Sequence, residues 1–460
     1  MKKSSATLRQ EMSALSAASD RLERGGGGGG GAGEEQGGGD EERLPNANLS
    51  NSSNRWSDPE PELDEWECKA NDAINFKLVM FEEDIADPKT TFHPTYTHQV
   101  FDNQIIRGYK EPRIDMYYTA GSLQLYLGLS YGERRVPPAS AYPPPKPNTE
   151  VYQTLNKFIP PDYTTNIDEF VKRLSTPFKP PGHVIRTYKL DKHDSGKNEK
   201  AKDKGTEDQV SYMVTKGDFS SEEVKAFHRR IQVFVLWYID RSSYLDDEDL
   251  EWEIYFIFEK RIREGKEHYR VVGYCTVYPF FAYPDSIRLR ISQVLVLPPY
   301  QKQGHGAHLL NAIYDDAKAR KGSYEHVKDI TVEDPSPEFT FLRDVTDLRN
   351  CWKHGFLTKQ NYTEELDAST IAAIQKELRL FKKQIEHLHE VVSYMYIDKS
   401  NKAKYKRYRL RVKQRLYKKY QDWLQGYEEG EPRRQELHDI YLEEVENFYR
   451  KIEEKLLLGD

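Results

Sequence analysis

A strand, a short loop with two glycines and a helix follow one another directly between residues 294 and 310. The apolar run Val294–Leu297 ends at a proline pair, and the loop that follows contains Gly304 and Gly306. The start of a helix offers up to four backbone N–H groups without partners and about half a positive charge. Small side chains leave these groups open to a diphosphate. The segment therefore predicts an α/β fold with a phosphate-binding loop at the start of a helix.

The spacing of the loop residues narrows the choice of phosphate ligand. The loop lacks the G-x-x-x-x-G-K-S/T pattern of a P-loop, and it lacks the third glycine and the ribose-binding acid of a dinucleotide fold. It matches Q/R-x-x-G-x-G/A as Gln301-x-x-Gly304-x-Gly306. In this it resembles the acetyl-CoA loop of the GCN5-related N-acetyltransferase (GNAT) superfamily. A glycine turn without a ligand is the alternative that the motif alone leaves open.

The elements around this loop complete an α/β order. Ser220 and Glu223 form a capping-box pattern ahead of an amphipathic helix of about five turns that ends near Tyr238. Glu264–Gly265 marks a turn between two strands. Strands are expected at Trp252–Phe258, Val271–Tyr278, Arg288–Leu297 and Val327–Val332, and helices at about residues 304–320 and from about Glu338. Residues 219–345 are thus expected to form a GNAT-type mixed sheet flanked by helices.

A chain of 460 residues exceeds one compact core, and its composition divides it into four segments. Residues 1–62 are a glycine-rich tail that cannot build a core. Residues 63–218 alternate short apolar runs with turn signals and are expected to form a smaller mixed α+β domain. Residues 219–345 follow as the acetyl-CoA-binding domain, and residues 346–460 as a helical C-terminal region. The turn-rich patches Val136–Pro147 and Asp191–Asp208 are expected to be surface loops.

The C-terminal region has an a/d pattern over about four heptads. Its apolar residues are spaced alternately by three and four positions: Ile371, Ile374, Leu378, Phe381, Ile385, Leu388, Val392 and Met395. A second series indicates a returning helix: Leu437, Tyr441, Val445, Phe448 and Ile452. We expect a helical hairpin that closes on itself, with a docking surface for a partner as the alternative.

Composition excludes several classes of protein. No apolar run approaches the roughly 20 residues that span a bilayer. Lys2 and Lys3 precede no apolar core, so we expect neither a signal peptide nor a membrane partner. The three cysteines lie far apart without a CxxC pair, which excludes a disulfide framework and a cysteine-rich zinc site and fits a reducing compartment. No metal is expected.

The net charge of −7 conceals a basic stretch at Lys399–Lys419, where lysines and arginines alternate with tyrosines. Such a stretch could contact phosphates or act as a nuclear-import signal. A solvated helix face is the more common role for such residues, so direct nucleic-acid binding is not expected.

The sequence around the loop resembles one family of the superfamily, the type B histone acetyltransferase catalytic subunits. The likeness covers Arg290–Leu297, Gln303–Leu310 and Ile330–Ser336, and further segments at Phe92–Gln99, Ala120–Leu123, Ile159–Pro161, Phe234–Trp237 and Leu342–Asp344. The resemblance implies a lysine N-acetyltransferase that uses acetyl-CoA to modify the amino-terminal tail of newly made, free histone H4. It also implies a WD-repeat histone chaperone as partner, and a location in both nucleus and cytoplasm.

Acetylation of lysine needs a base, because the amine has a pKa near 10.4 and its deprotonation at pH 7 costs about 4–5 kcal/mol. By the resemblance, Glu333 is the general base, and Asp334 is a second acid that assists it or binds the lysine. Taken alone, Glu333–Asp334–Pro335 would more simply be a helix-start signal. Cys275 offers a covalent route, but it lies mid-strand without a histidine beside it. We therefore expect a buried thiol and direct transfer in a ternary complex.

The resemblance also assigns binding residues. The acetyl-CoA contacts are Val294, Leu295 and Val296 along the pantetheine arm, Gln301, Lys302, Gln303, Gly304, His305, Gly306 and Ala307 around the diphosphate, and Ser336 and Phe339 after the base. The contacts with the substrate peptide are Tyr278, Pro279, Phe280, Asp102 and Asn103. Pro279 and Phe280 replace aromatics that the family has, and Asp102–Asn103 is less acidic than in the family. Within the loop, His305 is expected to be a solvent-facing spacer.

Two other functions remain open at this point. One is an acetyltransferase of the same fold with a non-histone substrate. The other is a catalytically inactive binder of chromatin or nucleic acid, for which the basic stretch is the support. An intact Glu333 argues against an inactive domain.

Overall fold

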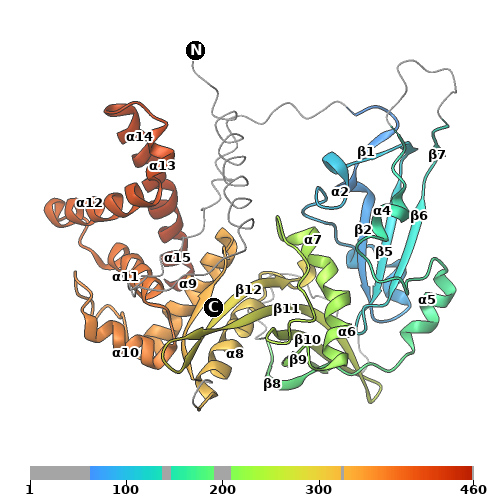
Figure 1. The fold of residues 1–460 in the computed structure, drawn as a ribbon, viewed down its shortest axis with the longest axis horizontal. Helices are drawn as coiled ribbons and strands as arrows, with labels where there is room; N and C mark the ends of the chain where they lie inside the picture. The colour runs from blue at the N-terminus through green and yellow to red at the C-terminus, as the bar shows by residue number, and fades with distance from the viewer. Residues whose placement is uncertain (1–62, 137–146, 191–208, 323–325, 458–460) are drawn as a thin grey trace, which may run out of the picture. The chain divides into compact units, whose positions relative to one another are not determined.

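The computed structural model describes residues 63–136, 147–190, 209–322 and 326–457 (Figure 1). The glycine-rich segment 1–62, most of Val136–Pro147 and all of Asp191–Asp208 lie outside the described residues, and so do the predictions made for them. The mixed α/β class with a helical C-terminal region is confirmed. Among these residues, no helix has the length and apolar character that crossing a bilayer requires.

Six strands form the central sheet, in the order β13-β12-β11-β10-β9-β8. Their bounds are β8 His183–Tyr188, β9 Gln209–Asp218, β10 Glu253–Arg263, β11 Lys266–Ala282, β12 Ser286–Val296 and β13 Val327–Val332. Neighbours are antiparallel except for β12 and β13, which run parallel. The four predicted strands are confirmed, and Glu264 and Gly265 turn β10 into β11 with positive φ at both residues. The sheet extends across the predicted domain boundary at residue 219, which stays a prediction.

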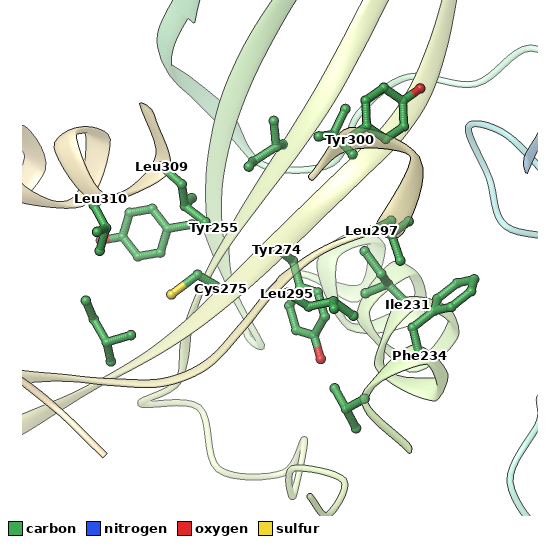
Figure 2. Close-up of a cluster of buried hydrophobic side chains, with 14 of the residues drawn as sticks. Ile231, Phe234, Tyr255, Tyr274, Cys275, Leu295, Leu297, Tyr300, Leu309 and Leu310 are labelled. Carbon is green, nitrogen blue, oxygen red and sulfur yellow. The ribbon is translucent and has the colours of Figure 1, made fainter. Parts of the chain in front are cut away.

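Helices cover both faces of this sheet (Figure 2). On one face, α6 (Glu222–Ile231), the 3-10 turn η4 (Gln232–Phe234) and α7 (Val235–Tyr238) bury Ile231 and Phe234. On the other, α8 (His305–Ala319) buries Leu309 and Leu310. The predicted helix before β10 is present, but its cap is Ser221 and not Ser220, because the Ser221 hydroxyl accepts from the Val224 N–H.

The side chains of successive residues of β11 point to opposite faces of the central sheet, as in any strand. Tyr274 points toward the α6 side and Cys275 toward α8 (Figure 2). Both are fully buried. Burial raises the pKa of the Cys275 thiol, which disfavours the nucleophilic thiolate. The cysteine thus packs as a small apolar side chain.

The N-terminal region has a three-stranded sheet of β2 (Ile74–Val79), β5 (Arg113–Thr119) and β6 (Leu125–Ser130). These strands coincide with apolar runs of the sequence. Two further strand pairs complete the strands of this region in the described part of the chain: β1 (Glu67–Lys69) with β3 (Ile105–Arg107), and β4 (Tyr109–Lys110) with β7 (Glu133–Arg134). The Ala120 carbonyl, just after β5, accepts from the Val271 N–H of β11 at 2.8 Å and so connects this region to the central sheet.

The C-terminal region is helical, but its heptad seam does not run through one helix. Arg379 adopts φ +57 and ends α10. Leu380 then pairs with Ile330 of β13, whose N–H donates to the Arg379 carbonyl at 2.9 Å, so the break covers the edge of the sheet. The seam residues Ile374 and Ile385 are buried, which favours helices that close on the protein itself. The helices are α10 (Ala368–Leu378), α11 (Lys382–Tyr396), α12 (Lys402–Lys419), α13 (Gln421–Gln425), α14 (Glu431–Tyr441), the π-turn η6 (Leu442–Asn447) and α15 (Phe448–Leu457).

Candidate active site

Strands β12 and β13 separate where the predicted base begins. Their parallel pairing ends at Ile291 and Val332, and the Glu333 N–H donates to the Ile291 carbonyl at 2.8 Å. Strand β12 continues to Val296 without a β13 partner among the described residues. One edge of the Val294–Val296 backbone therefore lacks a strand partner, as the addition of an extended ligand requires.

A β-bulge in β12 lies at this separation. Ser292 and Gln293 of β12 oppose the single residue Thr276 of β11. The Thr276 hydroxyl accepts from the Gln293 N–H at 3.0 Å. The Gln293 side chain accepts from the Tyr274 hydroxyl at 2.9 Å and donates to the Ser243 carbonyl at 2.8 Å. Because a bulge bends its strand and increases the local twist, it accounts for the divergence of β12 from β13.

The loop after β12 is held by its own side chains. Tyr300 is buried, and its hydroxyl donates to a carboxylate of β10 at 2.8 Å. Gln301 Nε2 donates to the Val296 carbonyl at 2.9 Å, and Gln303 Nε2 donates to the Pro299 carbonyl at 2.8 Å. The Gln301 side chain thus binds the last residue of β12, the Gln303 side chain binds the loop, and both leave the start of α8 uncovered.

No side chain caps the start of α8. Gly304 precedes it with φ +91, which side chains with a Cβ rarely adopt. A Cβ on Gly306 would lie 2.6 Å from Leu342 Cδ2 of the next helix, α9 (Pro337–Lys353). A larger residue at 306 would therefore force Leu342 to shift, so the glycine serves helix packing as well as ligand access, a reason that the sequence did not indicate. The first-turn amides of α8 remain available to an anion.

The prediction that His305 faces solvent is wrong. His305 is 1% exposed, and its Nδ1 lies 2.7 Å from the Tyr188 hydroxyl of β8. Its ring lies edge-on to Tyr212 and Tyr300, with centroids 4.6 and 5.7 Å away. Burial, with a smaller contribution from His308, lowers the pKa of His305 to about 4, so the ring is neutral at pH 7. His305 thus anchors the first turn of α8 to the sheet.

Glu333 and Asp334 directly follow β13, and both are exposed. The Ser292 hydroxyl of the bulge donates to Glu333 Oε2 at 2.8 Å. Asp334 has φ +35, a conformation that costs a non-glycine residue about 1–3 kcal/mol. The Glu333 carboxylate is therefore held where β12 and β13 separate. Its partner Ser292 lies two positions before Val294 in β12.

Ser336 and Phe339 have structural roles at the start of α9. The Ser336 hydroxyl accepts from the Phe339 N–H at 3.2 Å and caps the helix. Phe339 is half-buried and packs against the core. Their contact with acetyl-CoA stays a prediction.

The residues Tyr278–Phe280, which are predicted to contact the peptide, belong to an aromatic cluster on β11. The Tyr278 ring lies 4.9 Å from Trp252 and 4.8 Å from Phe280, and the Arg290 guanidinium lies 4.5 Å from the Phe280 ring. Phe280 is 39% exposed, so the cluster presents an aromatic face to solvent. Tyr278 of β11 pairs with Arg290 of β12, and the next residue of β12, Ile291, pairs with Val332 of β13. The cluster therefore lies next to the strand positions that directly precede Glu333.

Asp102 and Asn103 lie in an exposed 3-10 turn, η3 (Asp102–Gln104), in which Asn103 has φ +53. In the part of the chain that the structure describes, neither side chain has a hydrogen bond or ion pair with β11, β12 or α9. Their contact with a peptide stays a prediction.

A neighbouring segment of the N-terminal region contacts the end of α7 and the residues that follow it. The Tyr96 N–H donates to the Trp237 carbonyl at the end of α7, at 2.9 Å, and His98 lies 3.0 Å from the Asp240 carboxylate. Burial raises the pKa of Tyr96, and the carboxylates of Asp240 and Glu338 raise it further. These residues were not assigned from the sequence, although Tyr96 and His98 lie in a segment that carries the family resemblance.

The separated strand and the helix start fit one extended ligand. The backbone of β12 beyond Ile291 has no β13 partner and, apart from the Val296 carbonyl that Gln301 binds, can pair with amides of an arm. The N–H groups of α8 can hold a diphosphate beyond the connecting loop. These are the two features that acetyl-CoA requires. Within the described ranges, no three histidine, cysteine or acidic side chains gather as a metal site would need.

Two family descriptions match this chain. Residues 66–240 match the family described as histone acetyl transferase HAT1 N-terminus, and residues 225–337 match the acetyltransferase (GNAT) family. The second range contains β10 to β13, the glycine loop and Glu333.

Several proteins with the name histone acetyltransferase type B catalytic subunit are similar over most of the chain. The protein from Cryptococcus neoformans is 34% identical over 416 residues, which are 84% of this chain and 97% of that protein. The human protein is 31% identical over 78% of this chain and 82% of its own length. A protein from Dictyostelium discoideum is 34% identical over 76% of this chain and 72% of its own length.

Proposed function

Because the chain belongs to the family of type B histone acetyltransferase catalytic subunits and is a histone acetyltransferase, we propose that it transfers acetyl from acetyl-CoA directly to lysines of the amino-terminal tail of free histone H4. The observation that carries this proposal is the position of Glu333, hydrogen-bonded to Ser292 beside the unpaired part of β12. A carboxylate is thereby fixed next to the place where the thioester arm would lie.

The residues that would hold the co-substrate divide between strand and helix. The backbone of Val294–Val296 would pair with the pantetheine arm, and the first-turn amides of α8 would bind the diphosphate. Bound acetyl-CoA supplies an activated acetyl thioester. The His305–Tyr188 contact keeps the first turn of α8 in place from the sheet side.

In this proposal Glu333 accepts the proton of the substrate ammonium group. Deprotonation of lysine at pH 7 costs about 4–5 kcal/mol, and a placed carboxylate typically contributes about 10²–10⁴ in rate. The Ser292 hydroxyl orients the carboxylate through its bond to Oε2. Asp334, next in the chain, adds negative charge that favours the incoming cation.

A cationic peptide suits the surroundings of this carboxylate. The carboxylates of Asp240, which follows α7, and of Glu338, in the first turn of α9, both raise the pKa of Tyr96, so negative charge lies around this segment. The aromatic face at Tyr278–Phe280 offers apolar contact to the stems of lysine side chains. A WD-repeat histone chaperone as partner, and a location in nucleus and cytoplasm, are part of the same proposal and are supported by the family resemblance.

The substitution Glu333→Gln tests the base. We expect kcat with a free H4 tail peptide to fall by about 10²–10⁴, because the amide cannot accept the proton. The control Glu264→Gln changes an exposed acid in the β10–β11 turn and should keep the wild-type rate. If Glu333→Gln retains wild-type turnover, the base is elsewhere and the proposed mechanism is wrong.

A further inference from the structure

Helix α12 carries far more positive charge than any interaction within the chain requires. It has 18 residues and contains no acidic one. Ten are cations: Lys402, Lys404, Lys406, Arg407, Arg409, Arg411, Lys413, Arg415, Lys418 and Lys419. Ion pairs engage three of them in the described structure: Lys404 with Glu364, Arg415 with Glu390 and Lys419 with Glu444. The helix lies in the C-terminal part of the chain (Figure 1), outside the acetyltransferase match.

Four of the seven remaining cations are arranged in a line. Lys402, Lys406, Arg409 and Lys413 are spaced by four, three and four residues, so they lie along one face of α12. Together with Lys399, which precedes the helix, they line a groove of about 440 Å³. We call these five residues the α12 stripe. Over 11 residues of helix the stripe is about 16 Å long, at about 1.5 Å per residue.

The helix is folded onto the protein and is not an extended basic tail. Tyr408, Val412 and Leu416 are buried, and the Asn401 side chain caps the helix by accepting from the Lys404 N–H. These contacts hold the apolar face of α12 inside the chain. That face is consequently unable to insert into a lipid surface, which is what an amphipathic membrane helix needs.

Aromatic rings fix part of the stripe. The Arg409 guanidinium lies 5.3 Å from the Tyr441 ring, and Lys413 Nζ lies 5.6 Å from it. The Tyr405 hydroxyl donates to Glu446, and its ring stacks on Tyr408 at 6.4 Å. The cations are thus held in place over tyrosines that are themselves engaged or buried.

The composition of the stripe selects the class of partner. Lysine is depleted at protein–protein interfaces, whereas four of these five residues are lysines. A line of cations along a helix is the electrostatic footprint of a protein that binds nucleic acid. Proteins for single strands add free aromatic faces for base stacking, but Tyr405 and Tyr441, the tyrosines that lie against the stripe, are engaged. A histone tail, being cationic, is repelled by this surface.

We propose that the α12 stripe binds the phosphate backbone of duplex DNA without reading its sequence. Duplex DNA carries about one negative charge per 1.7 Å of its axis, so a stripe of about 16 Å meets several phosphates. This site is separate from the active site and does not depend on the proposed acetyl transfer. It revises the expectation from sequence that these cations are only a solvated face, because the structure gathers them in one groove.

Fluorescence anisotropy with the full chain and a labelled 20-base-pair duplex of random sequence tests the proposal. The variant Lys399→Glu/Lys402→Glu/Lys406→Glu reverses three exposed charges of the stripe. The matched control Lys359→Glu/Lys376→Glu/Lys383→Glu makes the same change of net charge at exposed lysines outside it. We expect the stripe variant to bind at least about tenfold more weakly than the control. The slope of log K against log salt should become shallower by about 0.9 for each phosphate that the variant no longer neutralises.

Four results would overturn the proposal. The wild-type chain shows no binding at low salt, or both triple variants lose affinity equally, which would indicate long-range charge and no site. Poly-glutamate competes as well as the duplex at equal charge, which would indicate an acidic protein partner. Anionic vesicles compete in the same way, which would indicate a lipid surface. Unchanged acetylation of a free H4 tail peptide by both variants shows that they are folded.

Discussion

At the scale of single residues, His305 supports the proposed site through a contact with the sheet, on the side away from the ligand. Its neighbours in the chain, Gly304 and Gly306, leave the amides of α8 open, while its own ring is buried against Tyr188. With a pKa lowered to about 4, the ring is neutral and adds no positive charge to the proposed diphosphate site at neutral pH. We therefore assign His305 a positioning role.

The substitution His305→Leu keeps an apolar side chain of similar bulk and removes the contact with Tyr188. One hydrogen bond is worth about 1 kcal/mol, so we expect the KM for acetyl-CoA to rise about fivefold with kcat nearly unchanged. Tyr188→Phe should reproduce the effect. Steady-state kinetics with varied acetyl-CoA checks both. A large loss of kcat at constant KM would instead make His305 a catalyst.

The residue pattern indicated the backbone of the loop better than the direction of its side chains. Gly304 could be identified because its positive φ is a local need, whereas the packing of Gly306 against Leu342 is not local. The acetyl-CoA contacts of Gln301, Gly304 and Gly306 stay predictions. The burial of His305 could not be identified, because its partner Tyr188 lies 117 positions away. Asp240 was likewise missed, because its contact with His98 exists only once the N-terminal region folds against α7.

At the scale of elements, the start of α8 depends on how closely it packs against α9. A Cβ on Gly306 would lie 2.6 Å from Leu342 Cδ2, so the Leu342 side chain would have to shift. On the sheet side, Gly273 of β11 has the same property, since a Cβ there would lie 2.2 Å from the Leu295 carbonyl oxygen. The two glycines let a helix and a strand approach on either side of the proposed acetyl-CoA site.

The substitution Gly306→Ala should lower the free energy of unfolding by about 1–3 kcal/mol, the usual effect of overpacking. Leu342→Ala in the same chain should relieve the clash, so the double variant should be more stable than the two single effects predict. Urea denaturation of the four proteins measures this coupling. Strict additivity would show that Leu342 moves aside without strain and that packing does not require Gly306.

The element order could be predicted because strand and helix patterns are local, and β10 to β13 occur where the apolar runs are. The heptad seam could not be placed correctly, because its spacing continues through Arg379 although the backbone reverses there to pair Leu380 with β13. That pairing depends on the open edge of β13, and the heptad spacing carries no information about a strand elsewhere in the chain.

At the scale of the whole molecule, buried polar side chains join the central sheet to the C-terminal helices. Tyr314 of α8 donates to Asp347 of α9 at 2.7 Å, and Asp344 of α9 lies 2.7 Å from His387 of α11. Gln384 of α11 donates to both aspartates, at 2.9 and 3.0 Å. Because an unpaired buried charge costs about 3–5 kcal/mol, these helices are expected to unfold together with the sheet.

The contribution of His228 to folding stability should decrease in mild acid. His228 is fully buried against Phe219 and Tyr274, and burial lowers its pKa to about 4. The unfolded chain binds this proton at about pH 6.5, so the stabilisation is complete above pH 6.5 and is lost as the pH falls toward 4. The same sign holds for His305. Each group contributes up to about 3 kcal/mol across this window.

The variant His228→Leu removes one of these two titratable imidazoles. Its free energy of unfolding should therefore vary less between pH 6.5 and pH 4 than that of the wild type. Denaturation at several pH values measures the difference. Equal pH dependence in the two proteins would show that His228 is accessible to protons in the folded state.

The start of α8 and Glu333 have separate tasks in this account: one holds acetyl-CoA and the other accepts a proton. Calorimetric titration of the wild-type chain and of Glu333→Gln with acetyl-CoA tests this division directly. We expect saturable binding by both, with dissociation constants that agree within about threefold, a difference of less than 1 kcal/mol. A wild-type chain that does not bind acetyl-CoA, or a Glu333→Gln chain that has lost binding together with turnover, would contradict it.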